Sequence, residues 1–350
     1  MGLIEQLRGV VAAVRLEFAA DPREAIFEVE ILEDGAALAV VGVTSEPAAA
    51  ESLQRRVGRI DAERPVTLEV ARLPDPAERR SHAICSSSIA PMLSGPFVAD
   101  PQVSQTVLGH RLLVYREHSR WLQCRSVDGY FGWIHRGYVH RVDELEARRW
   151  EAGDDGELCT SLGARAVGPG GTVLARLPWG ARVVRLDDGT VRLPDGTTAH
   201  VEGELVADSE REVRFPQRGE SLVSTAERWQ SAPYMWGGVT RAGVDCSGLV
   251  QVVHRTHGVQ LPRDSDQQAR VGHPVHPGHD FEELQAGDLL FFAEDEGRVS
   301  HVAISRGGPR IIHASLGNGG VGNNDLTGDS GFEAEMRRIF VCARRVLGED

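Results

Sequence analysis

The chain has 350 residues, with 51 acidic and 38 basic side chains and a formal net charge of −13 at pH 7. Its hydrophobic share of 41% and charged share of 25% are typical of a folded protein and exclude a disordered one. The negative charge repels phosphate backbones, so nucleic acid is not an expected partner.

The N-terminal segment is charged, from Glu5 to Glu17, and its longest apolar run, 10–14, is too short for a signal peptide. No other stretch approaches the ~20 apolar residues that cross a bilayer. We therefore expect a cytoplasmic protein that has no membrane partner.

Residues 1–74 predict a small α/β domain without a motif that carries chemistry. Periodic apolar residues indicate a helix over 3–14, and alternating residues over 26–31 and 37–41 flank a turn at Asp34-Gly35. Pro47 suits the first turn of a second helix, and residues 66–70 read as a strand. A structural or docking role is the default expectation.

Residues 75–149 and 150–210 read as two copies of one β-rich domain. Asp128-Gly129 and Asp195-Gly196 occupy equivalent turns between short strands, which favours small barrels. The pattern over 121–139 resembles bacterial SH3-type domains, which bind cell-wall peptides or support a neighbouring enzyme. The second copy lacks counterparts of Tyr130 and Trp133, so these aromatic residues either contact a ligand or fill the core of the barrel.

Residues 211–350 predict an α+β domain, because helical patterns over 220–230 and from Cys246 precede strands over 288–292 and 299–314. Five scattered cysteines without a CxxC pair indicate neither a disulfide framework nor a zinc site. The evenly spaced histidines from His273 to His279 lie among Pro and Gly residues, so we expect no metal there and no cofactor.

Cys246 is the candidate nucleophile of this domain. It precedes an apolar run and is placed at the N-terminal end of a buried helix, where unpaired backbone N–H groups and the helix dipole favour a thiolate. The alternative is a small buried residue at a helix start.

Two histidines in a predicted hairpin are the candidate bases. If Ser305 pairs with Pro309 across a three-residue turn, His301 lies directly opposite His313, with Cβ atoms ~5 Å apart. One imidazole then accepts the thiol proton while the other orients it. A register slip of one residue would put the two histidines on opposite faces of the sheet. The alternative is that both are ordinary half-buried strand residues.

Six segments occur in an order that resembles NlpC-type cell-wall cysteine peptidases: PYMWGG (233–238), DCSGLV (245–250), LPRDSDQQ (261–268), AGDLLFF (286–292), SHVAI (300–304) and IIHAS (311–315). The resemblance covers about residues 220–345. It implies a papain-like core with a triad of Cys246, His301 and His313. With SH3-type domains upstream, the arrangement resembles cytoplasmic γ-D-glutamyl-L-diamino-acid endopeptidases, which cut L-Ala-γ-D-Glu-diamino-acid peptides in murein recycling and require the free L-Ala amine.

The same resemblance implies residues that bind substrate. Asp245 and Tyr234 would hold the L-Ala amine and the γ-D-Glu group, and Tyr130 would close the site over the amine. The same pocket would be lined by Trp236, Ser247, Asp264 and Ser265. Residues 265–268 also fit a helix capping box. The resemblance also implies an acidic residue early in the first SH3-type domain. Pro101 occupies the matching position and Asp100 precedes it, which puts the strictness of amine selection in doubt.

The predicted function is hydrolysis of the γ-D-Glu to diamino-acid bond through a thioester. Two alternatives stay open: a hydrolase or amidase that acts on polymeric peptidoglycan, and a catalytically inert domain that binds murein peptides. The sequence decides neither between diaminopimelate and lysine in the substrate nor the oligomeric state.

Overall fold

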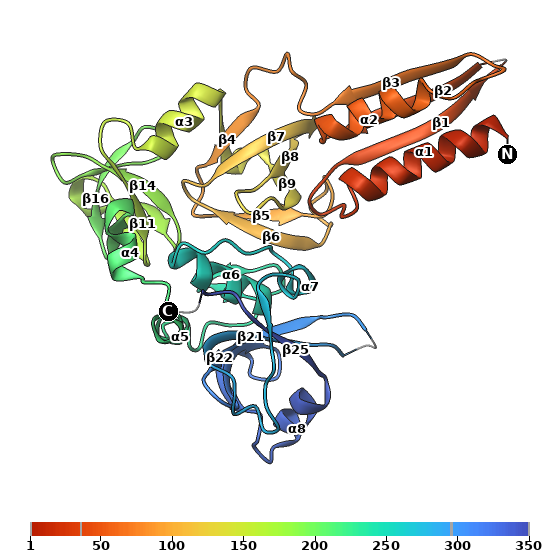
Figure 1. The fold of residues 1–350 in the computed structure, drawn as a ribbon. Helices are drawn as coiled ribbons and strands as arrows, with labels where there is room; N and C mark the ends of the chain where they lie inside the picture. The colour runs from red at the N-terminus through yellow and green to blue at the C-terminus, as the bar shows by residue number, and fades with distance from the viewer. Residues whose placement is uncertain (1, 36, 295–296, 349–350) are drawn as a thin grey trace.

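Residues 2–35, 37–294 and 297–348 are described by a computed structural model, which shows a multidomain chain of mixed helix and sheet (Figure 1). The N-terminal α/β unit projects from one side of the first β-rich domain, the second β-rich domain lies on its opposite side, and the C-terminal domain lies below it in this view (Figure 1). Among the helices in these residues, none has the length and apolar character needed to cross a bilayer.

The N-terminal unit has two helices on a three-stranded sheet, in which β1 and β2 are antiparallel and β2 and β3 are parallel. Leu7 and Val11 of the first helix and Leu53 of the second pack against Leu38 and Val40 of the sheet. The elements follow the predicted order, and Pro47 opens the second helix as expected. Residue 36 of the predicted turn lies outside the described residues. The elements are α1 (Leu3–Phe18), β1 (Phe27–Asp34), β2 (Ala37–Thr44), α2 (Pro47–Val57) and β3 (Val66–Arg72).

Two seven-stranded sheets follow, joined by a helix whose capping box is formed by Asp143 and Glu146. The first sheet contains β4 (His82–Cys85), β5 (Ile89–Leu93), β6 (Gln102–Val107), β7 (Arg111–His118), β8 (Trp121–Arg125), β9 (Phe131–His135) and β10 (Val139–Val142). The second contains β11 (Glu157–Ser161), β12 (Ala164–Val167), β13 (Val173–Leu177), β14 (Arg182–Arg185), β15 (Val191–Arg192), β16 (Thr198–Glu202) and β17 (Leu205–Ala207). The joining helix is α3 (Glu144–Ala152).

The two sheets have the same strand order. The first runs β10-β4-β7-β8-β9-β5-β6 and the second, read in reverse, runs β17-β11-β14-β15-β16-β12-β13. Counted from the first strand of each sheet, both orders are 7-1-4-5-6-2-3. The turns at Asp128-Gly129 and Asp195-Gly196 both connect the fifth strand to the sixth. Residues 75–210 therefore form two copies of one β-rich unit, whereas their assignment as closed SH3-like barrels remains a prediction.

The C-terminal domain places α5 and α6 against a six-stranded sheet of order β20-β25-β21-β22-β23-β24. Leu249 and Val253 of α6 share an apolar core with Phe291 and Ile304 of the sheet. Its helices are α5 (Gly219–Glu227), α6 (Cys246–Thr256), α7 (Ser265–Gln268) and α8 (Gly331–Arg338), preceded by the short α4 (Arg211–Arg214). Its strands are β18 (Val239–Thr240), β19 (Gly243–Val244), β20 (His273–Val275), β21 (Ala286–Phe292), β22 (His301–Arg306), β23 (Arg310–Ser315), β24 (Gly320–Asp325) and β25 (Phe340–Arg345).

Apolar contacts join the domains. Val107 of the first β-rich domain and Trp179 and Val206 of the second belong to the same buried cluster as the α6 residues. Ile26 of the N-terminal unit packs with Tyr115 and Phe131. The relative positions of the domains are therefore set by shared cores as well as by the covalent chain.

Arg23 ties the N-terminal unit to the C-terminal domain. Its Nη1 lies 2.8 Å from Asp264 Oδ2 and 2.7 Å from Asp266 Oδ1, while its Nη2 lies 2.6 Å from Asp21 Oδ2. Asp21 also accepts a hydrogen bond from Gln267 Nε2, at 3.0 Å. These contacts place the loop after α1 directly on α7.

We expect Arg23→Gln to loosen this contact. A partly exposed network of this kind is worth roughly 1–3 kcal/mol, because each bond to a charged group is stronger than a neutral one. Hydrogen–deuterium exchange of residues 264–268 should become faster, whereas Arg56→Gln, which breaks an exposed pair with Glu17 inside the N-terminal unit, should leave it unchanged. Equal exchange in wild type and Arg23→Gln would show that the ion pairs do not hold the domains together.

Candidate active site

Cys246 is the first residue of α6, as predicted, and Asp245 is the N-cap. The Asp245 Oδ1 atom accepts a hydrogen bond of 2.7 Å from the Gly248 N–H, which satisfies one of the unpaired donors of the first turn. Gly248 also allows close packing, since a Cβ there would lie 2.2 Å from the Gly238 carbonyl oxygen. The nucleophile candidate is thus held on a rigid, buried helix start.

Arg263 forms a buried bidentate pair with Asp245. Its Nη1 and Nη2 lie 3.0 Å and 2.6 Å from the two carboxylate oxygens, and its side chain is only 1% exposed. The same carboxylate also accepts hydrogen bonds from the Gly237 N–H at 2.8 Å and the Ser247 hydroxyl at 3.3 Å. The Asp245 carboxylate is therefore fully occupied by donors of the protein itself, and its predicted contact with the substrate amine stays a prediction.

His301 and His313 meet on the same face of the sheet, but in a different register from the predicted one. Ser305 pairs with Ile311 and not with Pro309, a displacement of two residues. The predicted pairing placed the turn one residue too early, whereas Gly307, Gly308 and Pro309 form the connection between β22 and β23. An even displacement keeps both side chains on one face. The two imidazoles are therefore diagonal neighbours, with His301 Nε2 2.7 Å from His313 Nδ1.

Asn324 extends this pair into a chain of hydrogen bonds. Its Oδ1 lies 3.0 Å from His313 Nε2 and accepts a second bond, of 2.8 Å, from Asn318 Nδ2. Because an amide oxygen only accepts, we infer that His313 carries its proton on Nε2. His313 Nδ1 then accepts from the His301 Nε2–H, which leaves His301 Nδ1 unprotonated and able to act as a base. In this tautomer the 3.2 Å approach of Asn318 Nδ2 to His313 Nε2 is a contact between two donors.

The Cys246 thiol lies against the start of β22, because α6 packs on that strand and the backbone N–H of Val302, the residue after His301, donates to the sulfur. Burial nevertheless raises the pKa of Cys246 to about 12, and the charge of Asp245 adds to the rise. The N–H groups of Val302 and Ser247 lower that pKa, but by less than burial raises it. The start of α6 was expected to lower the pKa of Cys246, but the net shift is upward.

The two histidines are also held neutral. Burial lowers the pKa of His301 to about 3, with a further contribution from His313, and burial likewise lowers the pKa of His313. The site at rest is thus a neutral thiol with two neutral imidazoles.

This charge state predicts a particular pH dependence for alkylation. The rate of Cys246 modification by iodoacetamide should rise about tenfold per pH unit from pH 7 to 10, because only the thiolate reacts and its fraction grows with pH below the pKa. Peptide mapping by mass spectrometry gives the rate at this cysteine. A preformed ion pair with His301 would instead give a rate that is flat from about pH 5 upward.

Tyr130 and Asp264 are brought together, as the predicted pocket requires. The Tyr130 hydroxyl donates a 3.1 Å hydrogen bond to Asp264 Oδ2, the same oxygen that Arg23 contacts. Burial and the neighbouring charge of Asp264 raise the pKa of Tyr130. The capping box of α7 uses Asp264 and Gln267, not Ser265 and Gln268, so the predicted box was wrong by one residue. Asp264 therefore caps a helix and contacts Tyr130 at once.

The other predicted pocket residues differ in their surroundings. Tyr234 is half-buried, and its pKa is raised by burial and, to a lesser extent, by the charge of the Cys246 thiolate. Trp236 is 69% exposed, so it forms part of the rim. The Ser247 hydroxyl accepts from Arg263 Nη1 at 2.9 Å, and Ser265 is buried on α7.

Sequence reasoning missed Arg23, Asn318 and Asn324. Asn324 had a signal in principle, because β24 pairs His313 with Gly322 and so places Asn324 on the same face of the sheet as His313. The strand that carries Asn324 begins at Gly320, directly after a turn that contains Asn318. Asp100 accepts a 2.9 Å bond from the Phe97 N–H within its own turn. The described parts of the chain contain no group of three or more His, Cys, Asp or Glu side chains arranged to hold a metal ion.

In a comparison with known protein families, residues 231–339 match the NlpC/P60 family. A γ-D-glutamyl-L-lysine dipeptidyl-peptidase of Bacillus cereus is 41% identical over 97 residues, and its counterpart in Bacillus subtilis is 32% identical over 125 residues. These alignments cover 27% and 35% of this chain and only 28% and 40% of those enzymes.

Two further comparisons extend the match. The crystal structure of an NlpC/P60 family protein from Bacillus cereus, 22% identical, superposes with a TM-score of 0.63 over 77% of this chain and 100% of the other, which shows a shared fold. A probable endopeptidase of Haemophilus influenzae is 37% identical over 133 residues, which are 35% of this chain and 80% of that protein. In this protein, the matched residues 231–339 lie in the C-terminal domain. This chain belongs to the NlpC/P60 family of peptidase homologues.

Proposed function

We propose that this protein is a cysteine peptidase that hydrolyses the bond between γ-D-Glu and the diamino acid of short murein peptides, with Cys246 as the nucleophile. The observation that carries the proposal is the hydrogen-bonded chain from Asn324 through His313 to His301, the residue before Val302, whose backbone N–H donates to the thiol. A base oriented by a second group is what nucleophilic catalysis by a neutral thiol requires.

The proposed reaction has two steps. In the first, His301 Nδ1 takes the thiol proton as Sγ attacks the γ-carbonyl carbon of D-Glu, and the same imidazole then returns that proton to the leaving amine. The product of this step is a thioester on Cys246 and a free diamino acid. In the second, water loses a proton to His301 and attacks the thioester, which releases the γ-D-Glu acid and restores the thiol. Backbone N–H groups at the start of α6 would hold the oxyanion in both steps.

Recognition of the L-Ala amine is proposed for the pair formed by Asp264 and Tyr130, together with Tyr234. An ammonium group is stabilised by a carboxylate and by aromatic faces. The names of the two Bacillus relatives, γ-D-glutamyl-L-lysine dipeptidyl-peptidases, support the γ-D-Glu specificity. In this chain Arg23 already contacts Asp264, which supports a less strict requirement for a free amine than the resemblance implies.

Incubation with L-Ala-γ-D-Glu-diaminopimelate, its lysine counterpart and the N-acetylated form of each, followed by mass spectrometry, tests the proposal. Release of L-Ala-γ-D-Glu from the free peptides is the expected result. Release of peptide from intact sacculi without cleavage of the short peptides would favour a hydrolase of polymeric peptidoglycan. Binding of the peptides without any cleavage would favour the inert binding domain.

A further inference from the structure

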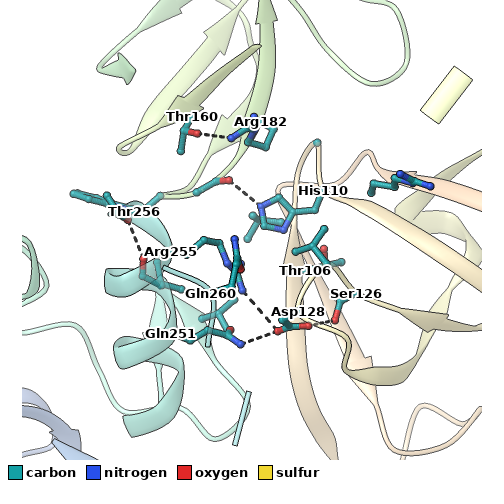
Figure 2. Close-up of a pocket in the computed structure, with 18 of the residues that line it drawn as sticks. Thr106, His110, Ser126, Asp128, Thr160, Arg182, Gln251, Arg255, Thr256 and Gln260 are labelled. Atoms are coloured by element: carbon teal, nitrogen blue, oxygen red, sulfur yellow. Dashed lines mark hydrogen bonds and ion pairs between the residues drawn. The ribbon is translucent and has the colours of Figure 1, made fainter. Parts of the chain in front are cut away.

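A cavity of about 280 Å³ lies where the two β-rich domains meet the peptidase domain (Figure 2). The first domain contributes Thr106, His110 and the turn at Asp128, and the second contributes Thr160, Trp179 and Arg182. The C-terminal half of α6 contributes Gln251, Arg255 and Thr256, whereas Cys246 lies at the opposite end of that helix. The cavity is therefore separate from the proposed peptidase site.

The walls of this cavity are positively charged, in a protein whose net charge is −13. Four arginines and two carboxylates line it. Both carboxylates are engaged by the protein. Glu151 lies 2.6 Å from Arg111 Nη1, and Asp128 accepts hydrogen bonds from Gln251 Nε2 at 2.8 Å and from the Tyr130 N–H at 3.2 Å. The four arginines are Arg111, Arg182, Arg211 and Arg255.

Two of the arginines lack adequate partners. The Arg255 guanidinium has one ion pair in the described residues, with Asp128 at 3.7 Å, and its Nε has no hydrogen-bond acceptor. Burial lowers the pKa of Arg255, which reflects the cost of holding this charge away from water. Arg211 has an unpaired Nε as well, and no ion pair within the part of the chain that the structure describes. An anion in the cavity would supply the missing acceptors.

The remaining walls indicate what the anion carries besides its charge. Trp150, Leu158, Trp179 and Phe215 form an apolar surface in the same cavity. Gln251 and Thr106 are 1% and 2% exposed, and their Oε1 and Oγ1 atoms have no partner. Buried polar atoms without partners are rare in folded proteins, and a bound molecule is one established explanation for them. An apolar body with a hydrogen-bond donor would match these features, and an inorganic ion alone would not.

From these contacts we propose that the cavity between the three domains is a binding site for a small organic anion, with a carboxylate or phosphate group at Arg255 and Arg211 and an apolar body against Trp179. A site of this kind would join three domains through one ligand, because each domain supplies part of its wall. The ligand would also contact α6, the helix that carries Cys246 at its other end.

Calorimetric titration of the full chain with matched probes tests the site. N-acetyl-leucine has a carboxylate, an amide N–H and an apolar side chain, and N-acetyl-leucinamide is its neutral counterpart; phenyl phosphate replaces the carboxylate by a phosphate. We expect saturable binding of at least one of the two anions and roughly tenfold weaker binding of the amide. The tighter anion identifies the charged group.

Arg255→Gln and Arg211→Gln should each weaken anion binding by roughly tenfold, while Arg148→Gln, an exposed substitution on α3, should leave it unchanged. Arg211→Gln removes a partly exposed side chain without an ion pair, so it tests the site even if Arg255→Gln fails to fold. No saturable binding of either anion, binding of the anion that is not weakened in either variant, or saturable binding of N-acetyl-leucine that its amide equals would overturn the proposal.

Discussion

Cys246→Ala is expected to reduce hydrolysis of the murein peptide by at least roughly 10⁴-fold, because without a sulfur no thioester forms and only bound water remains to attack. The substitution removes a single atom from a helix start whose capping groups are other residues, Asp245 and Gly248, so the fold should be retained. The measurement is kcat/KM for release of L-Ala-γ-D-Glu, combined with thermal unfolding of the variant.

Cys342→Ala is the matched control for this experiment. Cys342 is a partly exposed free cysteine on β25 and should change kcat/KM by no more than about twofold. Retention of activity by Cys246→Ala within about 100-fold of wild type would mean that another group performs the chemistry.

Arg263→Met is expected to give the largest loss of stability, roughly 3–5 kcal/mol in the free energy of unfolding. The guanidinium is 1% exposed and neutralises Asp245, so its removal leaves a carboxylate in a site with little access to water. Urea denaturation monitored by circular dichroism measures the change. Activity should fall with stability, because the same carboxylate caps the helix that carries Cys246.

A double-mutant cycle separates this pair from general damage to the core. Arg263→Met combined with Asp245→Asn should be less destabilised than the sum of the two single changes, by about 0.5–3 kcal/mol, since the variant no longer buries an unpaired charge. Arg148→Gln, which breaks an exposed pair with Glu144, should change stability by less than about 1 kcal/mol. A loss under about 1 kcal/mol for Arg263→Met would show that the pair does not stabilise the site.

Local patterns in the sequence were sufficient for much of the fold. The Asp-Cys-Ser start of α6, the hairpin that carries the two histidines and the paired Asp-Gly turns of the duplicated β-rich domains depend on neighbours along the chain, and each was predicted. The register of the hairpin was displaced because Gly307 and Gly308 both have positive φ and carry the turn one residue later than expected.

Features that depend on contacts between distant segments were not predictable in the same way. Arg23 reaches Asp264 across 241 residues of sequence, and nothing in the first domain marks it as a partner of α7. The direction of the Cys246 pKa shift also depends on tertiary burial, since the helix start alone favours a thiolate. The cavity lined by Arg255 exists only because three domains meet.

Acid quench of the enzyme within milliseconds of mixing with L-Ala-γ-D-Glu-diaminopimelate, followed by peptide mapping, examines the covalent step itself. A thioester of L-Ala-γ-D-Glu on the peptide that contains Cys246, much reduced in His301→Ala, is the result that the proposed chemistry predicts. Product formation at the full rate with Cys246 unmodified throughout, or an acyl group on a different residue, would contradict it.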